Sequence, residues 1–146
     1  MLIKVGNLLD VTAGAICHQV NLKGVMGAGL AKQIREKYPV VFSEYQLAIQ
    51  RKELRLGGVQ RVQVNEALWV FNLACQENYG RAKGTCYTNY DAVKSALTWV
   101  RTWQECTGYP VYLPYGMGAG LAGGDWERME QLIEQCLPIA TVLKLA

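Results

Sequence analysis

The chain has 146 residues, 51% of them hydrophobic, and a formal net charge of +3 from 15 basic and 12 acidic residues. This balance is typical of one soluble globular domain and excludes disordered, collagen-like and mucin-like chains. The small, dispersed positive charge does not indicate a nucleic-acid-binding surface, but it is compatible with one small anionic ligand. We expect a single domain over residues 1–146 that acts as a monomer.

No apolar run approaches the roughly 18 residues that a membrane-spanning helix needs, and Met1–Lys4 does not resemble the start of a signal peptide. We therefore expect a cytoplasmic protein without a membrane partner. The five cysteines are scattered without a Cys-x-x-Cys pair, and the chain has one histidine, His18. This set excludes a structural zinc site and predicts buried thiols in a reducing compartment, with no metal and no cofactor.

Short apolar runs rich in branched residues predict six strands, at residues 2–5, 15–20, 59–64, 68–73, 111–113 and 140–145. Apolar residues at three- and four-residue spacing predict four helices: from near Gly27 to Tyr38, after Pro39 to Ile49, from Tyr90 to Trp103, and from Trp126 to about Leu137. Thr88, three residues before Asp91, is expected to cap the third helix, and Asp125 the fourth.

The resulting order is β-β-α-α-β-β-α-β-α-β, and several of the strands are apolar along their whole length. Such strands are covered by helices on both faces. We therefore predict an α/β fold, a three-layer α/β/α sandwich with a mixed six-stranded sheet. In such folds ligands gather at the carboxyl ends of the strands.

Two glycine-rich segments follow predicted strands and open predicted helices, one at residues 24–29 and one at residues 116–124. Glycine lets a ligand approach the backbone, and a helix N-terminus presents free N–H groups, so each loop is a candidate phosphate cradle. Tight turns without a ligand are the alternative. Two loops at equivalent positions favour a ligand with two phosphates.

Two common nucleotide-binding patterns are excluded. The spacing Gly118-x-Gly120-x-x-Gly123 matches the dinucleotide fingerprint, but the strand that follows has no acidic residue for a ribose and there is no second half. Neither glycine loop contains the Gly-Lys-Ser/Thr sequence of a phosphate-binding P-loop.

Three segments together resemble the macrodomain family: Gly6-Asn7-Leu8-Leu9; Cys17-His18-Gln19-Val20-Asn21 with Gly24-Val-Met-Gly-Ala-Gly-Leu-Ala31; and Leu113-Pro-Tyr-Gly-Met-Gly-Ala-Gly-Leu-Ala-Gly-Gly-Asp-Trp126. The branch that is most similar contains the terminal ADP-ribose glycohydrolase and the yeast ADP-ribose 1″-phosphate phosphatase. The resemblance implies a cleft for ADP-ribose or a derivative of it, free or attached to a macromolecule.

The resemblance also implies which residues bind. Asn7, where the family usually has Asp, and Leu8 would contact adenine, Asn21 would hold the distal ribose, and the glycine loops would wrap the diphosphate. The full set of expected ligand-binding residues is Asn7, Leu8, Asn21, Gly24, Val25, Met26, Gly27, Ala28, Gly29, Gln76, Arg81, Met117, Gly118, Ala119, Gly120, Leu121 and Ala122.

The glycohydrolase branch uses a lysine that forms an adduct with the sugar, and Gln76 stands at its position. Glutamine does not form that adduct, although Lys83 in the nearby loop is a substitute to consider. Asp125 and His18 are the candidate catalytic acid or base, with helix capping and a hydrogen-bonded strand end as their respective alternatives. Arg81 is a candidate partner for a terminal phosphate, or a solvated surface residue.

These residues predict a hydrolase, with phosphate release from ADP-ribose 1″-phosphate as the first hypothesis. Water activated by His18 or Asp125 suits that reaction. A non-catalytic module that recognises ADP-ribose is the second hypothesis, and protein de-ADP-ribosylation without the lysine adduct is the third.

Overall fold

The computed structural model describes residues 1–146. The strands are β1 (Leu2–Val5), β2 (Gly14–Val20), β3 (Val59–Gln63), β4 (Leu68–Ala74), β5 (Val111–Pro114) and β6 (Thr141–Lys144). The helices are α1 (Gly29–Lys37), α2 (Pro39–Gln50), α3 (Tyr90–Thr107) and α4 (Trp126–Cys136), with a short 3₁₀ turn, η1 (Leu8–Asp10). The predicted strands and helices are all present in the predicted order, and their ends move by up to a few residues.

The strands form one six-stranded sheet in the order β1-β6-β5-β2-β4-β3. All neighbouring pairs are parallel except β3 with β4, which is antiparallel. The predicted mixed sheet is therefore confirmed. Because β2, β4 and β5 are parallel neighbours, the loops that follow them emerge along the same edge of the sheet.

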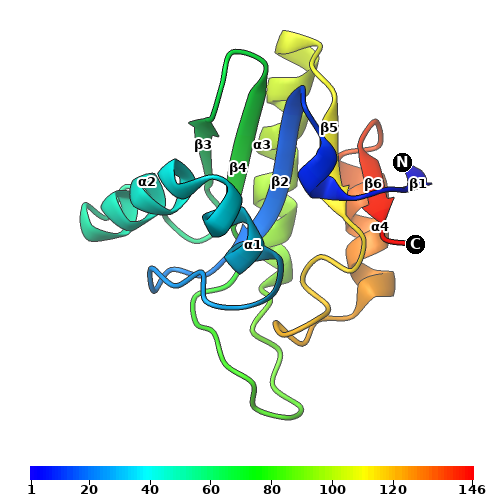
Figure 1. Cartoon of the computed structure of the whole chain (residues 1–146). Coiled ribbons are helices and arrows are strands. Elements are labelled where there is room, and N and C mark those ends of the chain that lie inside the picture. The colour runs from blue at the N-terminus through cyan, green and yellow to red at the C-terminus, as the bar shows by residue number, and fades with distance from the viewer.

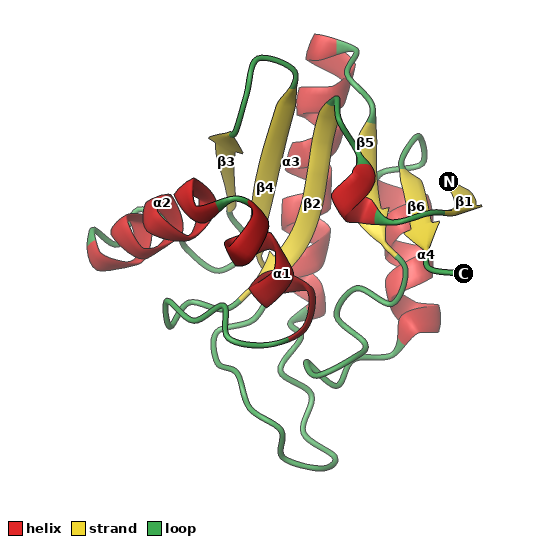
Figure 2. Ribbon diagram, in the orientation of Figure 1, coloured by secondary structure: helices red, strands yellow, loops and turns green.

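Helices cover both faces of this sheet (Figures 1 and 2). One core lies under α3 and α4 and contains Ala15 and Cys17 of β2, and the other lies under α1 and α2 and contains Ile16 and Val20 of the same strand. Side chains alternate between the two faces along a strand, so an apolar run such as β2 is buried on both sides. This alternation confirms the three-layer sandwich.

The N-terminus of α3 differs from the prediction. Asn89, not Thr88, is the N-cap, and its side chain accepts a hydrogen bond from the N–H of Ala92 at 3.0 Å. Thr88 lies one residue outside the helix, where its hydroxyl donates to the carbonyl of Gly118 at 2.8 Å. The predicted cap of α4 is confirmed, because the Asp125 side chain accepts from the N–H of Glu127.

The expectation that all cysteines are buried is wrong for two of them. Cys17, Cys75 and Cys136 are buried, whereas Cys86 and Cys106 are exposed. Cys86 lies in the loop between β4 and α3, and Cys106 lies in the last turn of α3 on the side away from the core. None of the helices is long and apolar enough to cross a lipid bilayer.

Candidate functional site

A cavity of about 760 Å³ opens at the carboxyl edge of the sheet. Its walls come from three segments: the end of β2 with the first glycine loop and the start of α1, the segment after β4, and the second glycine loop after β5. The long loop between β4 and α3 extends beyond this edge (Figure 1). The site is therefore where a sheet of parallel strands is expected to bind a ligand.

Most of the residues expected from the sequence line this cavity. The lining includes His18, Asn21, Val25, Met26, Gly27, Ala28, Gly29, Gln76, Arg81, Met117, Gly118, Gly120, Leu121 and Ala122. The lining does not include Asn7, Leu8, Gly24, Ala119 or Asp125.

Asn7 and Leu8 have local structural roles instead. The Asn7 side chain caps η1 by accepting a hydrogen bond from the N–H of Leu9 at 2.9 Å. Leu8 is 4% exposed and belongs to the core under α1 and α2. Burial of its apolar side chain turns Leu8 inward. The structure thus does not bring the two expected adenine contacts to the cavity wall.

Asp125 is exposed and stands outside the cavity. Its carboxylate caps α4, and its N–H donates to the hydroxyl of Tyr90 at 2.8 Å. Of the two interpretations that the sequence left open, this geometry supports the helix cap.

The first glycine loop is held by the side chain of Asn21. Its Nδ2 donates to the carbonyl of Val25 at 2.8 Å, and its Oδ1 accepts from the N–H of Lys23 at 2.9 Å. The buried Tyr45 of α2 adds its hydroxyl, 2.7 Å from the Asn21 carbonyl oxygen and 2.8 Å from Oδ1, and accepts from the N–H of Gly24 at 3.2 Å. Asn21 thus lines the cavity while its side chain shapes the loop.

A second network joins β2 to the second glycine loop. Gln19 Nε2 donates to Gln76 Oε1 and to Thr88 Oγ1, each at 2.9 Å. Gln76 in turn donates to the carbonyl of Asn78 at 2.8 Å, so its amide is committed within the protein. Both donors of Gln19 are used, and its buried Oε1 has no partner. This oxygen is an oriented acceptor beside the second glycine loop.

The position of Gly118 has no room for a side chain. Its φ is +77°, and a Cβ atom there would lie 2.9 Å from Gln19 Oε1 and 3.1 Å from both Thr88 Oγ1 and Met129 Cε. Only glycine adopts this backbone conformation without strain. The close packing of Gly118 therefore lets the second loop lie against the end of β2.

Both glycine loops present free backbone donors. The residues concerned lie in the cavity wall, and their N–H groups have no hydrogen-bond partner in the protein: Met26, Gly27 and Ala28 in the first loop, and Gly118, Gly120, Leu121 and Ala122 in the second. Clustered N–H groups in a concave loop form an anion-binding site. Each loop thus contains unpaired N–H groups of the kind that bind anions.

His18 is 2% exposed and lines the cavity. Burial lowers the pKa of its imidazole from 6.5 to about 4, although the hydrogen bond to Asn72 acts in the opposite direction. The ring is therefore neutral at physiological pH. Desolvation disfavours the imidazolium, which argues against His18 as a proton-donating acid near neutral pH.

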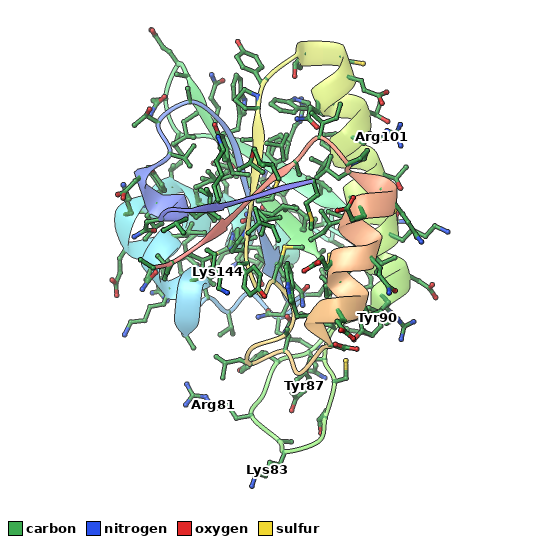
Figure 3. All side chains as sticks on the ribbon, turned by 90° about the vertical axis from the view of Figure 1, so that its right-hand side faces the viewer. Arg81, Lys83, Tyr87, Tyr90, Arg101 and Lys144 are labelled. Carbon is green, nitrogen blue, oxygen red and sulfur yellow. The ribbon has the colours of Figure 1, made fainter.

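Arg81 is the one residue of the cavity wall with a permanent charge. It also lines a smaller cavity of about 320 Å³ between its own loop and the second glycine loop. Figure 3 shows Arg81 and Lys83 pointing outward from this loop, and Lys83 lines neither cavity. The cavity wall therefore contains no lysine that could replace the adduct-forming lysine of the glycohydrolase branch, whose position is occupied by Gln76.

Sequence reasoning missed several lining residues, above all Gln19, Tyr79 and Tyr115. Gln19 lies between His18 and Asn21, two predicted site residues at the end of β2, so its position in the sequence could have indicated that it lines the cavity. Tyr115 directly precedes the second loop, packs its ring on Trp126 with centroids 4.7 Å apart, and has the Lys144 ammonium 4.5 Å from its ring centroid. Tyr79 is an exposed aromatic on the loop after β4, with no sequence signal that distinguishes it.

No model of a protein family matches the chain. Among curated proteins, it is 29% identical over 129 residues to a DNA ADP-ribosyl glycohydrolase from Mycobacterium tuberculosis, and 27% identical over 135 residues to one from Thermus aquaticus. The alignments cover 86% and 90% of this chain but only 35% and 36% of the two relatives. The chain thus spans about a third of the length of the curated relatives it matches.

Solved structures of other proteins share this fold. A protein of unknown function from Bacteroides thetaiotaomicron has a TM-score of 0.88 and 31% identity, with 99% of this chain and 97% of that one covered. A macrodomain protein from Streptomyces coelicolor has a TM-score of 0.81 and 27% identity, with 99% and 98% covered. Thermosipho africanus DarTG in complex with ADP-ribose, at 21% identity and a TM-score of 0.81 over 99% of this chain and 42% of that one, shares the fold.

The mixed sheet, the two glycine loops at its carboxyl edge and these neighbours define one class of protein. The chain has the macrodomain fold and is similar in sequence to a macrodomain protein and to two DNA ADP-ribosyl glycohydrolases.

Proposed function

We propose that the cavity binds ADP-ribose. The observation that carries this proposal is the pair of glycine loops, which line one cavity and contain N–H groups without a hydrogen-bond partner in the protein. A diphosphate has oxygens on two neighbouring phosphorus atoms. Two adjacent sets of N–H donors therefore match a diphosphate better than they match a single phosphate. The structure of a relative in the same fold with ADP-ribose supports the choice of ligand.

We propose further that the protein is a hydrolase that removes a group attached to the distal ribose. In this reaction water adds its oxygen to the anomeric carbon, the bond to the attached group breaks, and that group leaves with a proton. The curated relatives are named for such a reaction on ADP-ribosylated DNA, so ADP-ribosyl DNA is the first substrate to test. Direct attack by water suits a cavity wall that contains Gln76 and no lysine.

ADP-ribose 1″-phosphate is the second candidate substrate. The observation that favours it is Arg81, an exposed arginine that contributes to the cavity wall from the loop after β4 and has no ion-pair partner. The fork of donors on arginine matches the oxygens of a terminal phosphate. With this substrate, hydrolysis releases inorganic phosphate.

Calorimetric titration with ADP-ribose, with AMP and NAD as controls, tests binding. We expect ADP-ribose to bind more tightly than AMP, because AMP lacks the second phosphate and the distal ribose. NAD, which carries a nicotinamide on the distal ribose, tests whether the cavity accepts that attached group. An affinity for ADP-ribose no greater than for AMP would overturn the proposed ligand.

Turnover is then measured on two substrates, an oligonucleotide that carries ADP-ribose and ADP-ribose 1″-phosphate. Release of free ADP-ribose from either one supports the hydrolase. Arg81→Ala should weaken use of the 1″-phosphate, while Lys83→Ala, a matched loss of charge outside the cavity wall, should not. Tight ADP-ribose binding with no turnover of either substrate would contradict the hydrolase and leave a recognition module.

A further inference from the structure

Three polar side chains lie in register across the sheet beneath α2. His18 of β2 pairs with Asn72 of β4, and Asn72 pairs with Gln60 of β3. Side chains paired in register project from the same face of a sheet. Ile16 and Val20 are each two residues from His18 on β2, so their side chains project from the same face as His18. Both belong to the core under α1 and α2, so the row lies on the face that this core covers.

The hydrogen bonds in this row have a defined direction. Gln60 Nε2 lies 2.9 Å from the backbone carbonyl of Glu44 in α2, which is an acceptor only, so this end of the Gln60 amide is the donor. Gln60 Oε1 must then accept from Asn72 Nδ2, at 3.0 Å. Asn72 Oδ1 is left facing His18 Nε2. Since Oδ1 is an acceptor, Nε2 must carry the proton.

The direction of the row determines the chemistry of the other ring nitrogen. A neutral imidazole has one protonated nitrogen, so a proton on Nε2 leaves a lone pair on Nδ1. Nδ1 is buried and has no hydrogen-bond partner in the protein. An unsatisfied buried acceptor is unfavourable, and a donor that reaches it recovers that cost. Because His18 is a residue of the cavity wall, we infer that a group bound in the cavity is this donor.

We propose that Gln60 and Asn72 are positioning residues that hold His18 as the neutral Nε2–H tautomer, so that its Nδ1 accepts a hydrogen bond from a hydroxyl group or a water molecule bound in the cavity. His18 thus acts as an oriented acceptor and does not supply a proton. The sequence hypothesis of a catalytic acid or base is replaced by a role in orienting the bound group. The ligand half of this inference rests on the proposed binding of ADP-ribose, whereas the tautomer half is independent of it.

The tautomer is measured by nitrogen NMR of protein labelled with ¹⁵N-histidine. His18 is the only histidine in the chain, so the imidazole signals need no assignment. In the ligand-free protein at neutral pH we expect a protonated Nε2 and an unprotonated Nδ1. A protonated Nδ1, or an even mixture of the two tautomers, would overturn the proposed direction of the row.

The positioning role is tested with Gln60→Leu, which removes the group that orients the Asn72 amide. We expect the tautomer preference of His18 to weaken and the affinity for ADP-ribose to fall about three- to tenfold, the size expected for one hydrogen bond. Gln63→Leu is the matched control, because Gln63 has the same side chain on the same strand but on the opposite, exposed face. An unchanged tautomer signature in Gln60→Leu would contradict the positioning role.

The acceptor role is tested by adding ADP-ribose to the labelled wild-type protein. We expect the Nδ1 resonance to shift on saturation while the Nε2 proton remains. If ADP-ribose binds by calorimetry and the Nδ1 resonance does not move, the acceptor role is wrong and the proposed function stands. If ADP-ribose does not bind, the proposed function fails, and the ligand-free spectrum still decides the tautomer.

Discussion

The hydroxyl of Tyr45, on α2, lies 2.7 Å from the carbonyl oxygen of Asn21, the first residue after β2. The same hydroxyl accepts a hydrogen bond from the N–H of Gly24. One buried side chain of the helix layer thus joins the end of β2 to the start of the first glycine loop. The shape of a loop that was expected to bind phosphate depends on a residue 24 positions away from Asn21 in the chain.

Tyr45→Phe should therefore loosen this loop while leaving the core filled. The loss of the hydroxyl leaves the Gly24 N–H without its partner, and we expect the free energy of unfolding to fall by about 1–2 kcal/mol. The affinity for ADP-ribose should fall as well, because the loop loses its preorganised shape. Chemical denaturation and calorimetry measure the two effects. Tyr109→Phe, at an exposed tyrosine, is the control and should change neither.

Gly118→Ala should disrupt the second loop. Alanine at a φ of +77° is strained, and its Cβ would lie 2.9 Å from Gln19 Oε1. We expect a loss of about 2–4 kcal/mol in the free energy of unfolding, together with weaker ADP-ribose binding. Gly120→Ala is the control for stability in the same loop, because a Cβ there meets no protein atom within 4 Å. Equal losses for the two variants would contradict the special role of Gly118.

Asp125→Ala should reduce stability and leave the ligand in place. Its carboxylate caps α4 and lies outside the cavity wall, so we expect a loss of about 1 kcal/mol in the free energy of unfolding. The affinity for ADP-ribose and any turnover should remain at the wild-type level once the protein is folded. Asp125→Ser should restore stability, because serine also caps helices. A loss of turnover in a stable Asp125→Ser variant would instead support a catalytic carboxylate.

His18 should make stability depend on pH. Burial lowers its pKa from 6.5 to about 4, so between these values the unfolded chain binds a proton that the folded protein does not. The His18 contribution to the free energy of unfolding is therefore fully present above pH 6.5 and is lost as the pH falls towards 4, by about 3 kcal/mol in total.

Denaturation of the wild type and of His18→Gln at pH 7, 5.5 and 4 isolates this effect from that of the carboxylates. The difference in stability between the two proteins should shrink as the pH falls. A difference that stays constant over this range would mean that the imidazole does not titrate as its burial requires.

Local sequence was enough to predict much of this protein. The apolar runs predicted the strands and the three-layer sandwich, because alternation and helical periodicity are properties of neighbouring residues. Glycines shortly after β2 and β5 predicted the two loops that line the cavity, and Asp125 before Trp126 predicted the cap of α4. In each of these cases the residues that determine the structure are close together in the chain.

Tertiary structure decided the features that depend on partners from other elements. By its sequence position Thr88 is a suitable N-cap for α3, but Asn89 takes that role. The Thr88 hydroxyl instead donates a hydrogen bond to the carbonyl of Gly118 in the second glycine loop. The pKa of His18 and the direction of its hydrogen bonds depend on Asn72 and on burial, neither of which is visible in β2 alone. A hydrogen-bond network is a property of atoms brought together by folding, so only the assembled sheet determines which nitrogen of this single histidine carries its proton.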